Sequence, residues 1–485
     1  MKKIILPISL IITILFSIII IKTLLSTSKQ ISHAQTSSDS TQVKQDTTSQ
    51  YLADAVKFKT VSAKNNHFDH QDEFINFNRH LEKTFPKTHN TLARKQIGQN
   101  SLLFIWRGTK TQTTPVLFIT HSDVVPVEPG HIWSFPPFSG KISDGYIWGR
   151  GTLDNKVNVI AQLLAIETLV VNGFQPTRTL LFAIGADEET GGENGARKIA
   201  EYLNNLNLNP GVILDEGGVI TKNIIPSINS PVALIGIAEK GYLTLSLHVS
   251  QAGGHASMPP HHTAIGRLSS ALHKLEASPL PTKITSPIRQ MFDYLGPEMG
   301  SWRKALIANL WLFQPLVKHQ LSLSPSTNAS IQSTMAITQI NGGMAENILP
   351  PSASATINIR LLPGDTVESV TEHVRQAIQD PGVIISTTSG NYEASPVSDT
   401  DTNFFRSMQE TIHQLYPDTL VAPYLSISAS DSRHFVKTGR NIYRFSPLRL
   451  DNNDLKRIHG KDERISEIDF KNAVDFYQQL FVKLN

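Results

Sequence analysis

The sequence predicts an α/β protein with a central, mostly parallel sheet flanked by helices. Two observations carry this prediction. Short apolar runs that suit strands, such as Val116–Thr120 and Thr179–Ile184, alternate with helical patterns at Asn158–Val171 and Glu193–Leu206. Alternation of this kind indicates parallel pairing. Polar motifs also follow directly after the apolar runs, where the ligand sites of such sheets form.

The first 25 residues predict a single-pass membrane anchor. Two lysines precede an apolar stretch from Ile4 to Ile21, which is close to the ~20 residues that span a bilayer, and they favour a cytoplasmic N-terminus. Ser32–Ala34 supports the alternative of a cleaved signal and a secreted protein. Residues 26–50 are rich in Ser, Thr and Gln and predict a flexible linker. Under either alternative, the remainder is expected to be periplasmic or otherwise extracytoplasmic.

Composition narrows the class of protein. The chain has 485 residues, which exceeds one ordinary core and predicts two domains. Its 40% hydrophobic and 18% charged residues are typical of a globular protein. A net charge of only +3, without a basic stripe, argues against nucleic acid as a partner. The absence of cysteine excludes disulfides, thiolate metal sites and a cysteine nucleophile.

Two segments, 51–238 and 393–485, predict one catalytic domain interrupted by an inserted domain at 239–392. The pattern changes near Glu239, after which strands alternate between apolar and polar residues. Two strand–helix units of this size predict a smaller α+β, ferredoxin-like domain inserted into the first. Inside the insertion, Ser286–Leu323 is apolar and rich in aromatic residues; a helix packed on the domain is favoured over a membrane contact.

Five polar motifs offer metal ligands. Together they supply two histidines and several carboxylates, which is a ligand set that Zn²⁺ accepts. One such motif means little, but five in one chain, mostly at strand ends, indicate a metal-dependent hydrolase. The motifs are THSD at 120–123, GRGTLDN at 149–155, ADEETGGENGA at 186–196, ILDEGG at 213–218 and RIHGKDERI at 457–465.

The first two motifs predict a histidine ligand and a shared carboxylate. His121 and Asp123 are two residues apart at a strand end and project to the same side, so Asp123 can hold the imidazole for metal binding. Asp154 follows a glycine-rich loop and begins a helix, which alone would indicate only an N-cap. Its two oxygens can also bridge two metal ions.

The other motifs divide the remaining chemistry. Glu188 and Glu189 are adjacent, so their side chains diverge, and one can bind metal while the other serves as a general base. A charged surface turn is the alternative for this pair. We expect Asp215 to be a ligand because it lies at the end of a strand, closest to the sheet rim. His459 supplies the second imidazole.

These motifs resemble those of the aminoacylase, carboxypeptidase S and succinyl-diaminopimelate desuccinylase family of di-zinc hydrolases. The resemblance extends from Tyr51 to the end of the chain. It implies two Zn²⁺ per subunit, which Co²⁺ or Mn²⁺ can replace, and a cis peptide after the bridging aspartate. The implied roles are zinc ligands at His121 and Asp215 for one ion, Glu189 and His459 for the other, Asp154 as the bridge, Glu188 as general base and Asp123 as the carboxylate behind the histidine.

The resemblance also covers the inserted domain. GGHAS at 253–257 is similar to a loop whose histidine, here His255, stabilises the oxyanion, often across a dimer. Residues 345–360 are similar to a segment whose asparagine and arginine contact substrate, which implies Asn347 and Arg360; an arginine can clamp a carboxylate with two hydrogen bonds. Arg433 is a further candidate, although Ser428–Ser430 replaces a glycine-rich lead-in and leaves its role open.

Together these features predict a zinc-dependent hydrolase of amide bonds next to a free carboxylate. A carboxypeptidase acting on small peptides is the first expectation, and an N-acyl-amino-acid amidohydrolase is the second. The segment NLWLFQPLV resembles the carboxypeptidase S branch, which includes secreted N-fatty-acyl-amino-acid hydrolases. A non-catalytic metal-binding protein is disfavoured because the base and every ligand type are present. The resemblance implies that the inserted domain serves as a lid or in dimerisation, since the family often forms homodimers through it, whereas a large insertion such as Ser286–Leu323 can block them; the oligomeric state stays open at this point.

Overall fold

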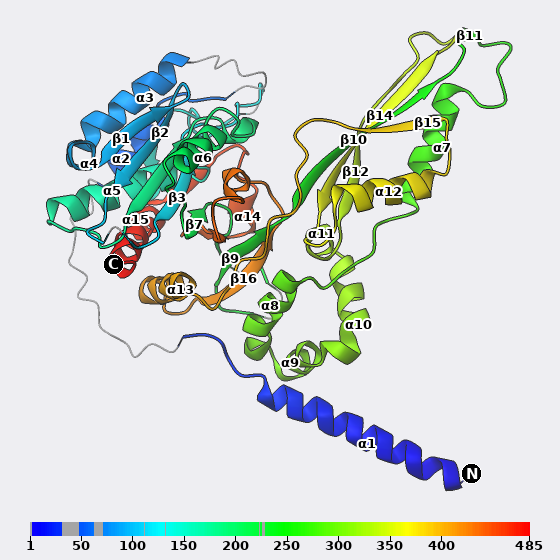
Figure 1. Cartoon of the computed structure of the whole chain (residues 1–485), viewed down its shortest axis with the longest axis horizontal. Helices are drawn as coiled ribbons and strands as arrows, with labels where there is room; N and C mark the ends of the chain where they lie inside the picture. Colours follow the sequence, from blue (N-terminus) through cyan, green and yellow to red (C-terminus); the bar gives the residue numbers. More distant parts are fainter. Residues whose placement is uncertain are drawn as a thin grey trace.

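The computed structural model describes residues 2–31, 48–62, 71–110, 112–130, 132–222, 224–225 and 228–485, with the backbone alone for residues 2–9. Figure 1 shows a broad body, an elongated domain that extends away from it, and the N-terminal helix α1 (Lys2–Leu25) beneath them. Within the described residues, no helix is both long enough and apolar enough to cross a membrane. Most of the predicted linker, 26–50, lies outside the described residues.

A ten-stranded sheet forms the larger body. Its strands are β1 (Ala93–Ile97), β2 (Ser101–Trp106), β3 (Val116–His121), β6 (Leu180–Gly185), β7 (Val212–Asp215), β8 (Ile220–Thr221), β9 (Val232–Glu239), β16 (Leu420–Ser426), β17 (Asn441–Arg444) and β18 (Arg449–Leu450). The order is β1-β2-β6-β3-β7-β17-β9-β8-β18, with β16 beside β9. Because β6, β3, β7 and β17 run parallel in the middle of this sheet, the predicted α/β class is confirmed.

Helices cover both faces of this sheet, which explains why β3 and β6 are apolar and buried throughout. Phe118 and Phe182 stack with ring centroids 5.3 Å apart and pack edge-on against Phe481. The alternate side chains of the same strands pack on the opposite face. The covering helices are α5 (Lys156–Val171) and α15 (Glu467–Lys483) on the first face, and α6 (Ala196–Asn205) on the second.

The elongated domain is a four-stranded antiparallel sheet backed by two helices. Along the chain it comprises β10 (Gly241–Ser250), α7 (Ala264–Glu276), β12 (Thr334–Gly342), β14 (Ser352–Leu361), α12 (Val367–Ile378) and β15 (Val383–Thr387). The strand order is β12-β14-β10-β15, so the connectivity is ferredoxin-like as predicted. Alternate residues of β10 and β14 are buried against the helices, since only one face of this sheet is covered.

A helical segment separates the two strand–helix units and packs near the junction of the domains (Figure 1). Its buried side chains form a small core with Ala238, Leu362 and Leu425, residues at or next to strands of both sheets. The segment comprises α8 (Ser286–Leu295), η2 (Gly296–Glu298), α9 (Ser301–Ala308), α10 (Leu310–Ser322) and α11 (Pro325–Ile331).

Shorter elements complete the structure. One of them matters for the site, because β19 pairs with β5 and brings the segment after His459 against the loop that leads to Asp154. These elements are α2 (Thr48–Val56), α3 (Gln71–Thr84), α4 (Pro86–Thr91), β4 (Lys141–Ser143), β5 (Tyr146–Trp148), η1 (Glu188–Thr190), β11 (Gly254–His255), β13 (Ile348–Leu349), α13 (Asn403–Leu415), η3 (Asp431–Phe435), α14 (Asn452–Leu455) and β19 (Arg464–Ser466).

Candidate metal centre

The polar motifs meet at the carboxyl ends of three adjacent strands, β6, β3 and β7. His121 is the last residue of β3, Glu188 and Glu189 follow β6, and Glu216 follows β7 directly. Asp154 reaches the same place from the start of α5, and His459 comes from the loop after α14. Five chain segments therefore converge on one edge of the sheet, as the sequence predicts.

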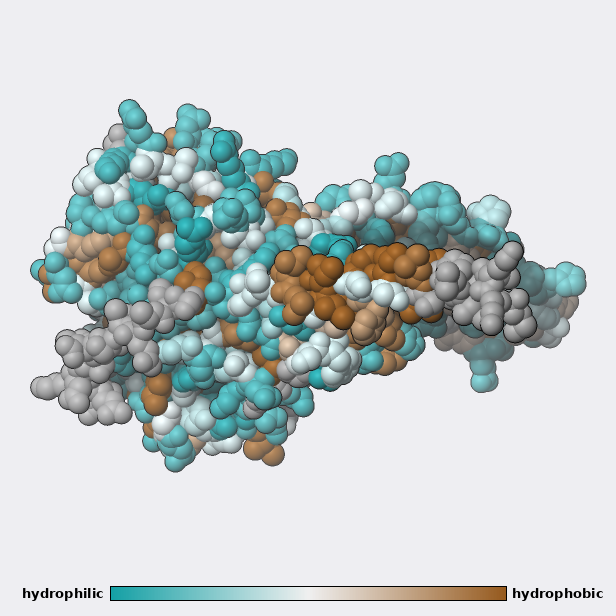
Figure 2. Space-filling view, turned by 90° about the horizontal axis from the view of Figure 1, so that it is seen from below, coloured by the Kyte–Doolittle hydropathy of each residue, from teal (hydrophilic) through white to brown (hydrophobic). Residues whose placement is uncertain are grey.

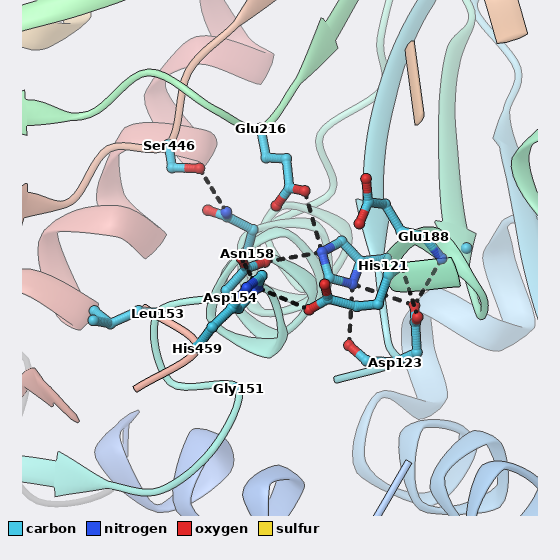
Figure 3. A network of polar contacts seen from close by, with 12 residues as sticks. His121, Asp123, Gly151, Leu153, Asp154, Asn158, Glu188, Glu216, Ser446 and His459 are labelled. Atoms are coloured by element: carbon cyan, nitrogen blue, oxygen red, sulfur yellow. Dashed lines mark hydrogen bonds and ion pairs between the residues drawn. The ribbon is translucent and has the colours of Figure 1, made fainter. Parts of the chain in front are cut away.

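The converging side chains form two groups that share Asp154 (Figure 3). In the first, His121 Nε2 lies 3.0 Å from Asp154 Oδ1 and 3.1 Å from Glu216 Oε1. In the second, His459 Nε2 lies 3.0 Å from Asp154 Oδ2 and 3.2 Å from Glu189 Oε1. The ligand atoms of each group lie within 4.8 Å of one another. One carboxylate oxygen faces each group, which is the arrangement of a bridging ligand for two metal ions.

Glu216 takes the place that the sequence analysis assigned to Asp215. The carboxylate of Asp215 accepts hydrogen bonds from the backbone N–H groups of Glu216 at 2.9 Å and Ser432 at 2.7 Å. It therefore stays among backbone donors, while the next side chain turns to His121. The reason is strand geometry: successive residues point to opposite sides, so the last residue of β7 and the first residue beyond it cannot both face the site.

Asp123 holds both a ligand and the turn that carries the acidic pair. Its carboxylate lies 3.3 Å from His121 Nδ1 and accepts a hydrogen bond of 2.8 Å from Ser62 Oγ. It also accepts from the backbone N–H groups of Glu188 at 3.2 Å and Glu189 at 3.1 Å. These contacts fit the predicted role behind the histidine, and they extend it to the positioning of the acidic pair.

A second buried carboxylate, Glu463, was missed by the sequence analysis. It accepts hydrogen bonds from the backbone N–H groups of Gly151 at 2.9 Å and Leu153 at 2.8 Å, and pairs with Arg150 at 2.7 Å. These contacts hold the loop that presents Asp154, whose peptide bond to Asn155 is cis as the resemblance implied. The available signal was its place four residues after His459 in the same motif.

The electrostatics of the cluster suit cations. Burial alone would lower the pKa of His121, but the carboxylates of Glu216, Asp123 and Asp154 together raise it well above its ordinary value. Hydrogen bonds that His459 donates to the carboxylates of Asp154 and Glu189 raise the pKa of its imidazole to about 10. Imidazoles held in this way are surrounded by excess negative charge. Nitrogen and carboxylate donors in two groups of three fit a pair of divalent metal ions.

Glu188 belongs to neither ligand group, although it lines the same cleft. Burial raises the pKa of its carboxyl well above the usual range, and the nearby Asp431 and Glu216 add to the shift while His121 opposes it. An uncoordinated carboxyl with a raised pKa is suited to proton transfer near neutral pH.

The metal-ligand groups face a cleft of about 1140 Å³ with two kinds of lining. One part of the lining consists of two arginines beside tyrosine rings. Arg360 of the inserted domain lies 4.7 Å from the ring of Tyr242, and Arg433 of η3, in the larger body, lies 5.4 Å from the ring of Tyr392. The two tyrosine rings stack with centroids 6.0 Å apart. From the segments around the loop before α5, β18 and α14, the lining is apolar: Leu153, Val219, Leu448, Leu450, Leu455 and Ile458.

Two predicted site residues lie away from the metal-ligand groups in space. His255 and Asn347 are both exposed beside the β11–β13 pair at the far tip of the inserted domain (Figure 1). His255 Nδ1 lies 2.8 Å from Ser257 Oγ, and the backbone oxygen of Asn347 accepts from Ala256 at 3.1 Å. Neither residue lines the cleft. Within one chain, therefore, the structure does not bring them to the metal-ligand groups.

The fold and the paired ligand groups define a metal-dependent hydrolase with an inserted second domain. Residues 117–483 match Peptidase family M20/M25/M40, and the chain belongs to this family. It is 42% identical to "Probable carboxypeptidase S-like 2" of Dictyostelium discoideum, over 89% of this chain and 84% of that protein. It is 40% identical to "N-fatty-acyl-amino acid synthase/hydrolase PM20D1" of Xenopus tropicalis, over 83% of this chain and 79% of that protein.

A solved structure agrees with the fold. The M20 family metallo-carboxypeptidase Sso-CP2 from Sulfolobus solfataricus superposes with a TM-score of 0.64 at 19% identity, over 90% of this chain and 99% of that one. The family resemblance inferred from the motifs is therefore confirmed. So is its chemical class, because the chain is a hydrolase of a metallopeptidase family.

Proposed function

We propose that this protein is a di-zinc carboxypeptidase that cleaves the amide bond next to a free carboxylate. The observation that carries the proposal is the shared cleft, in which the paired ligand groups and two arginines line one space. Arg360 Nη1 is buried and has no hydrogen-bond partner within the described part of the chain, so it is available to a substrate. A guanidinium is the side chain best suited to bind a carboxylate with two parallel hydrogen bonds.

Each side chain then has a part in the reaction. His121 and Glu216 would hold one ion, Glu189 and His459 would hold the other, and Asp154 would contribute to both. Two zinc ions bound there would polarise the scissile carbonyl and lower the pKa of the attacking water. Glu188 takes a proton from that water and delivers it to the leaving amine nitrogen. Arg360 and Arg433, each beside a tyrosine ring, hold the substrate carboxylate at a fixed distance from the reacting bond.

A second candidate is an N-acyl-amino-acid amidohydrolase. The apolar lining of the same cleft favours it, since six aliphatic side chains from Leu153 to Ile458 suit the acyl part of a substrate. The name of the Xenopus relative supports it as well. Both candidates use the same carboxylate clamp and the same base, and they differ only in whether the acyl part is an amino-acid residue or an alkyl chain.

We further propose that the working enzyme is a homodimer in which His255 and Asn347 reach the cleft of the partner subunit. The support is their location, because both residues lie at the exposed tip of the inserted domain and away from their own cleft. In this arrangement His255 donates to the oxyanion that forms as the carbonyl is attacked, and Asn347 contacts the substrate.

The N-terminal segment bears on where the protein is located in the cell and not on the reaction. We propose that it carries the catalytic body out of the cytoplasm, either as a retained anchor or as a cleaved signal. Cell fractionation combined with sequencing of the mature N-terminus distinguishes these outcomes. A full-length chain recovered in the cytoplasm contradicts both.

A matched substrate panel tests the reaction itself. Dipeptides and N-acyl amino acids of increasing acyl length are each offered with a free carboxylate and as the corresponding amide. We expect turnover of the free acids only, its loss with 1,10-phenanthroline, and its return with added zinc. Equal rates on acids and amides would exclude the carboxylate clamp. Faster turnover of long-chain N-acyl amino acids than of dipeptides would select the second candidate.

A further inference from the structure

Helices α9 and α10 expose large apolar side chains in an unusual concentration. Trp302 is 62% exposed, Trp311 48%, Leu316 53% and Leu323 63%. On α10, Trp311, Leu312 and Leu316 are exposed, and Leu323 at the C-cap of the helix continues this exposed apolar run. We name Trp302 together with these four residues the α9–α10 face.

The other side of α10 is fixed to the protein. Leu310 and Val317 are only 7% and 8% exposed and pack into the small core with Ala238, Leu362 and Leu425. These three belong to the strands and strand ends at the junction of the domains. Helix α10 therefore carries apolar side chains both where it packs against the protein and where it meets solvent.

The charged residues on the two helices themselves have one sign. No aspartate or glutamate occurs between Glu298 and Glu346, while Arg303, Lys304 and Lys318 fall on the two helices. The guanidinium of Arg303 lies 4.4 Å from the ring of Trp302. Exposed tryptophans accompanied by cations and without acidic residues are typical of segments that lie in the interface of an anionic membrane.

Helix α1 extends the same apolar surface. Asn309, fully buried, donates to the backbone oxygen of Ile19 at 3.2 Å and to Thr23 Oγ1 at 3.3 Å, and accepts from Trp311 Nε1 at 3.2 Å. The ammonium of Lys22 lies 5.6 Å from the ring of Trp311. Figure 2 shows the apolar band that α1 forms on this side of the molecule. Its α1 members include Leu10, Ile11, Ile12, Ile14, Phe16, Ile20, Ile21, Leu24 and Leu25.

A second copy of the chain is a poorer occupant than a lipid surface. In a twofold dimer the same patch contacts itself, so Arg303, Lys304 and Lys318 would meet their own counterparts, and neither helix carries an acid to pair with them. Like charges placed together in this way oppose association. Anionic headgroups instead neutralise these cations, while the tryptophan rings and leucines enter the region of the upper acyl chains.

We propose that the α9–α10 face is a membrane-docking surface that places Trp302, Trp311 and Leu316 in the interface of an anionic bilayer, alongside α1. This docking positions the whole body, because α10 is joined through Leu310 and Val317 to the junction of the two domains. It is additional to catalysis and to the predicted anchor, because it uses side chains of α9 and α10 that lie outside the N-terminal segment.

Tryptophan quenching in the full-length protein tests this surface. The protein is bound to vesicles of phosphatidylglycerol and brominated phosphatidylcholine, because bromine quenches only tryptophans that enter the lipid. Helix α1 contains no tryptophan, so its own insertion gives no signal. Besides Trp302 and Trp311, the chain has three tryptophans in the larger body, of which Trp106 and Trp148 are buried and Trp133 is half-buried. We expect bromine-dependent quenching in the parent and its loss in the Trp302→Phe/Trp311→Phe variant.

Trp133→Phe serves as the matched control and should keep the quenching of the parent. Arg303→Glu/Lys318→Glu keeps both tryptophans but should lose most of the quenching, since the anionic headgroups then repel the face. The proposal is overturned if vesicle-bound parent shows no quenching, or if the double phenylalanine variant is quenched as strongly as the parent. A lipid-free dimer that shields Trp302 and Trp311 from iodide would also overturn it, in favour of a second copy.

Discussion

The metal-ligand groups and the tip of the inserted domain carry predicted site residues in opposite physical states. At the ligand groups, His121 is 1% exposed and its second nitrogen lies against Asp123, and two backbone N–H groups fix the acidic turn to the same carboxylate. At the tip, His255 and Asn347 are exposed and have only local partners. One region is held within the chain, whereas the other is available to a second molecule.

The two regions also differ in how their side chains are held in place. The buried carboxylates Asp123, Asp215 and Glu463 each accept backbone N–H groups, which keeps charged groups away from water at a tolerable cost. Asp123 and Glu463 in this way hold the backbone segments that carry the ligands Glu189 and Asp154. The tip residues lack such support, because within the described chain their partners are local ones at the tip itself.

The largest effect is expected at the base. Glu188→Ala should lower kcat by roughly 10²–10⁴-fold, because its carboxyl lines the cleft beside both ligand groups and is free to move the proton. Both metal ions should remain, since Glu188 belongs to neither ligand group. Steady-state kinetics together with metal analysis of the same preparation check both statements. A variant as fast as the parent would remove Glu188 from the mechanism.

The adjacent pair Asp215–Glu216 provides a matched comparison. Glu216→Ala should lose one of the two ions, because Glu216 is the carboxylate 3.1 Å from His121 Nε2. Asp215→Asn should keep both ions, since its oxygens accept backbone N–H groups instead of facing the site. Metal content per chain after dialysis is the measurement. Loss of metal from the asparagine variant alone would restore the original assignment of Asp215.

That pair also shows how far sequence reasoning reached. The apolar runs and the motifs after them located the parallel sheet and the edge where the site forms, because strand ends meet there whatever the details. Which member of Asp215–Glu216 faces the site depends on the backbone conformation just after β7. Patterns of apolar and polar residues in the sequence do not determine that conformation. Helix starts differed for a similar reason: α5 begins at Lys156 instead of Asn158, because the loop before it is tied to Glu463.

Long-range pairing was the second limit. Glu463 was overlooked because its partners lie about 310 residues away in the chain, although it follows His459 closely. His255 and Asn347 came from a resemblance, and no contact within one chain tests their roles. Tyr242 and Tyr392, which stack beside the arginines, gave no signal because each lies in an ordinary strand or loop pattern.

The tip is tested by mixing two inactive variants. His255→Ala should lower kcat by roughly 10²–10³-fold, as the loss of one oxyanion donor does, and leave both ions in place. If His255 acts across the dimer, exchange with the Glu188→Ala variant creates one complete site in each mixed dimer. Activity should then return to about one quarter of the parent level after random exchange. Activity that stays at the sum of the two separate variants excludes action from the partner subunit.

The smallest effect is expected behind the ligands. Glu463→Gln keeps the shape of the side chain but weakens the hydrogen bonds from Gly151 and Leu153 and removes the ion pair with Arg150. The loop that presents Asp154 should then loosen, with a loss of ~10–100-fold in metal affinity. Titration of the metal-free protein with zinc measures the loss directly, and saturating zinc should restore most of the turnover. Turnover that stays low at saturating zinc would instead mean that Glu463 acts on the reaction itself and not through the position of Asp154.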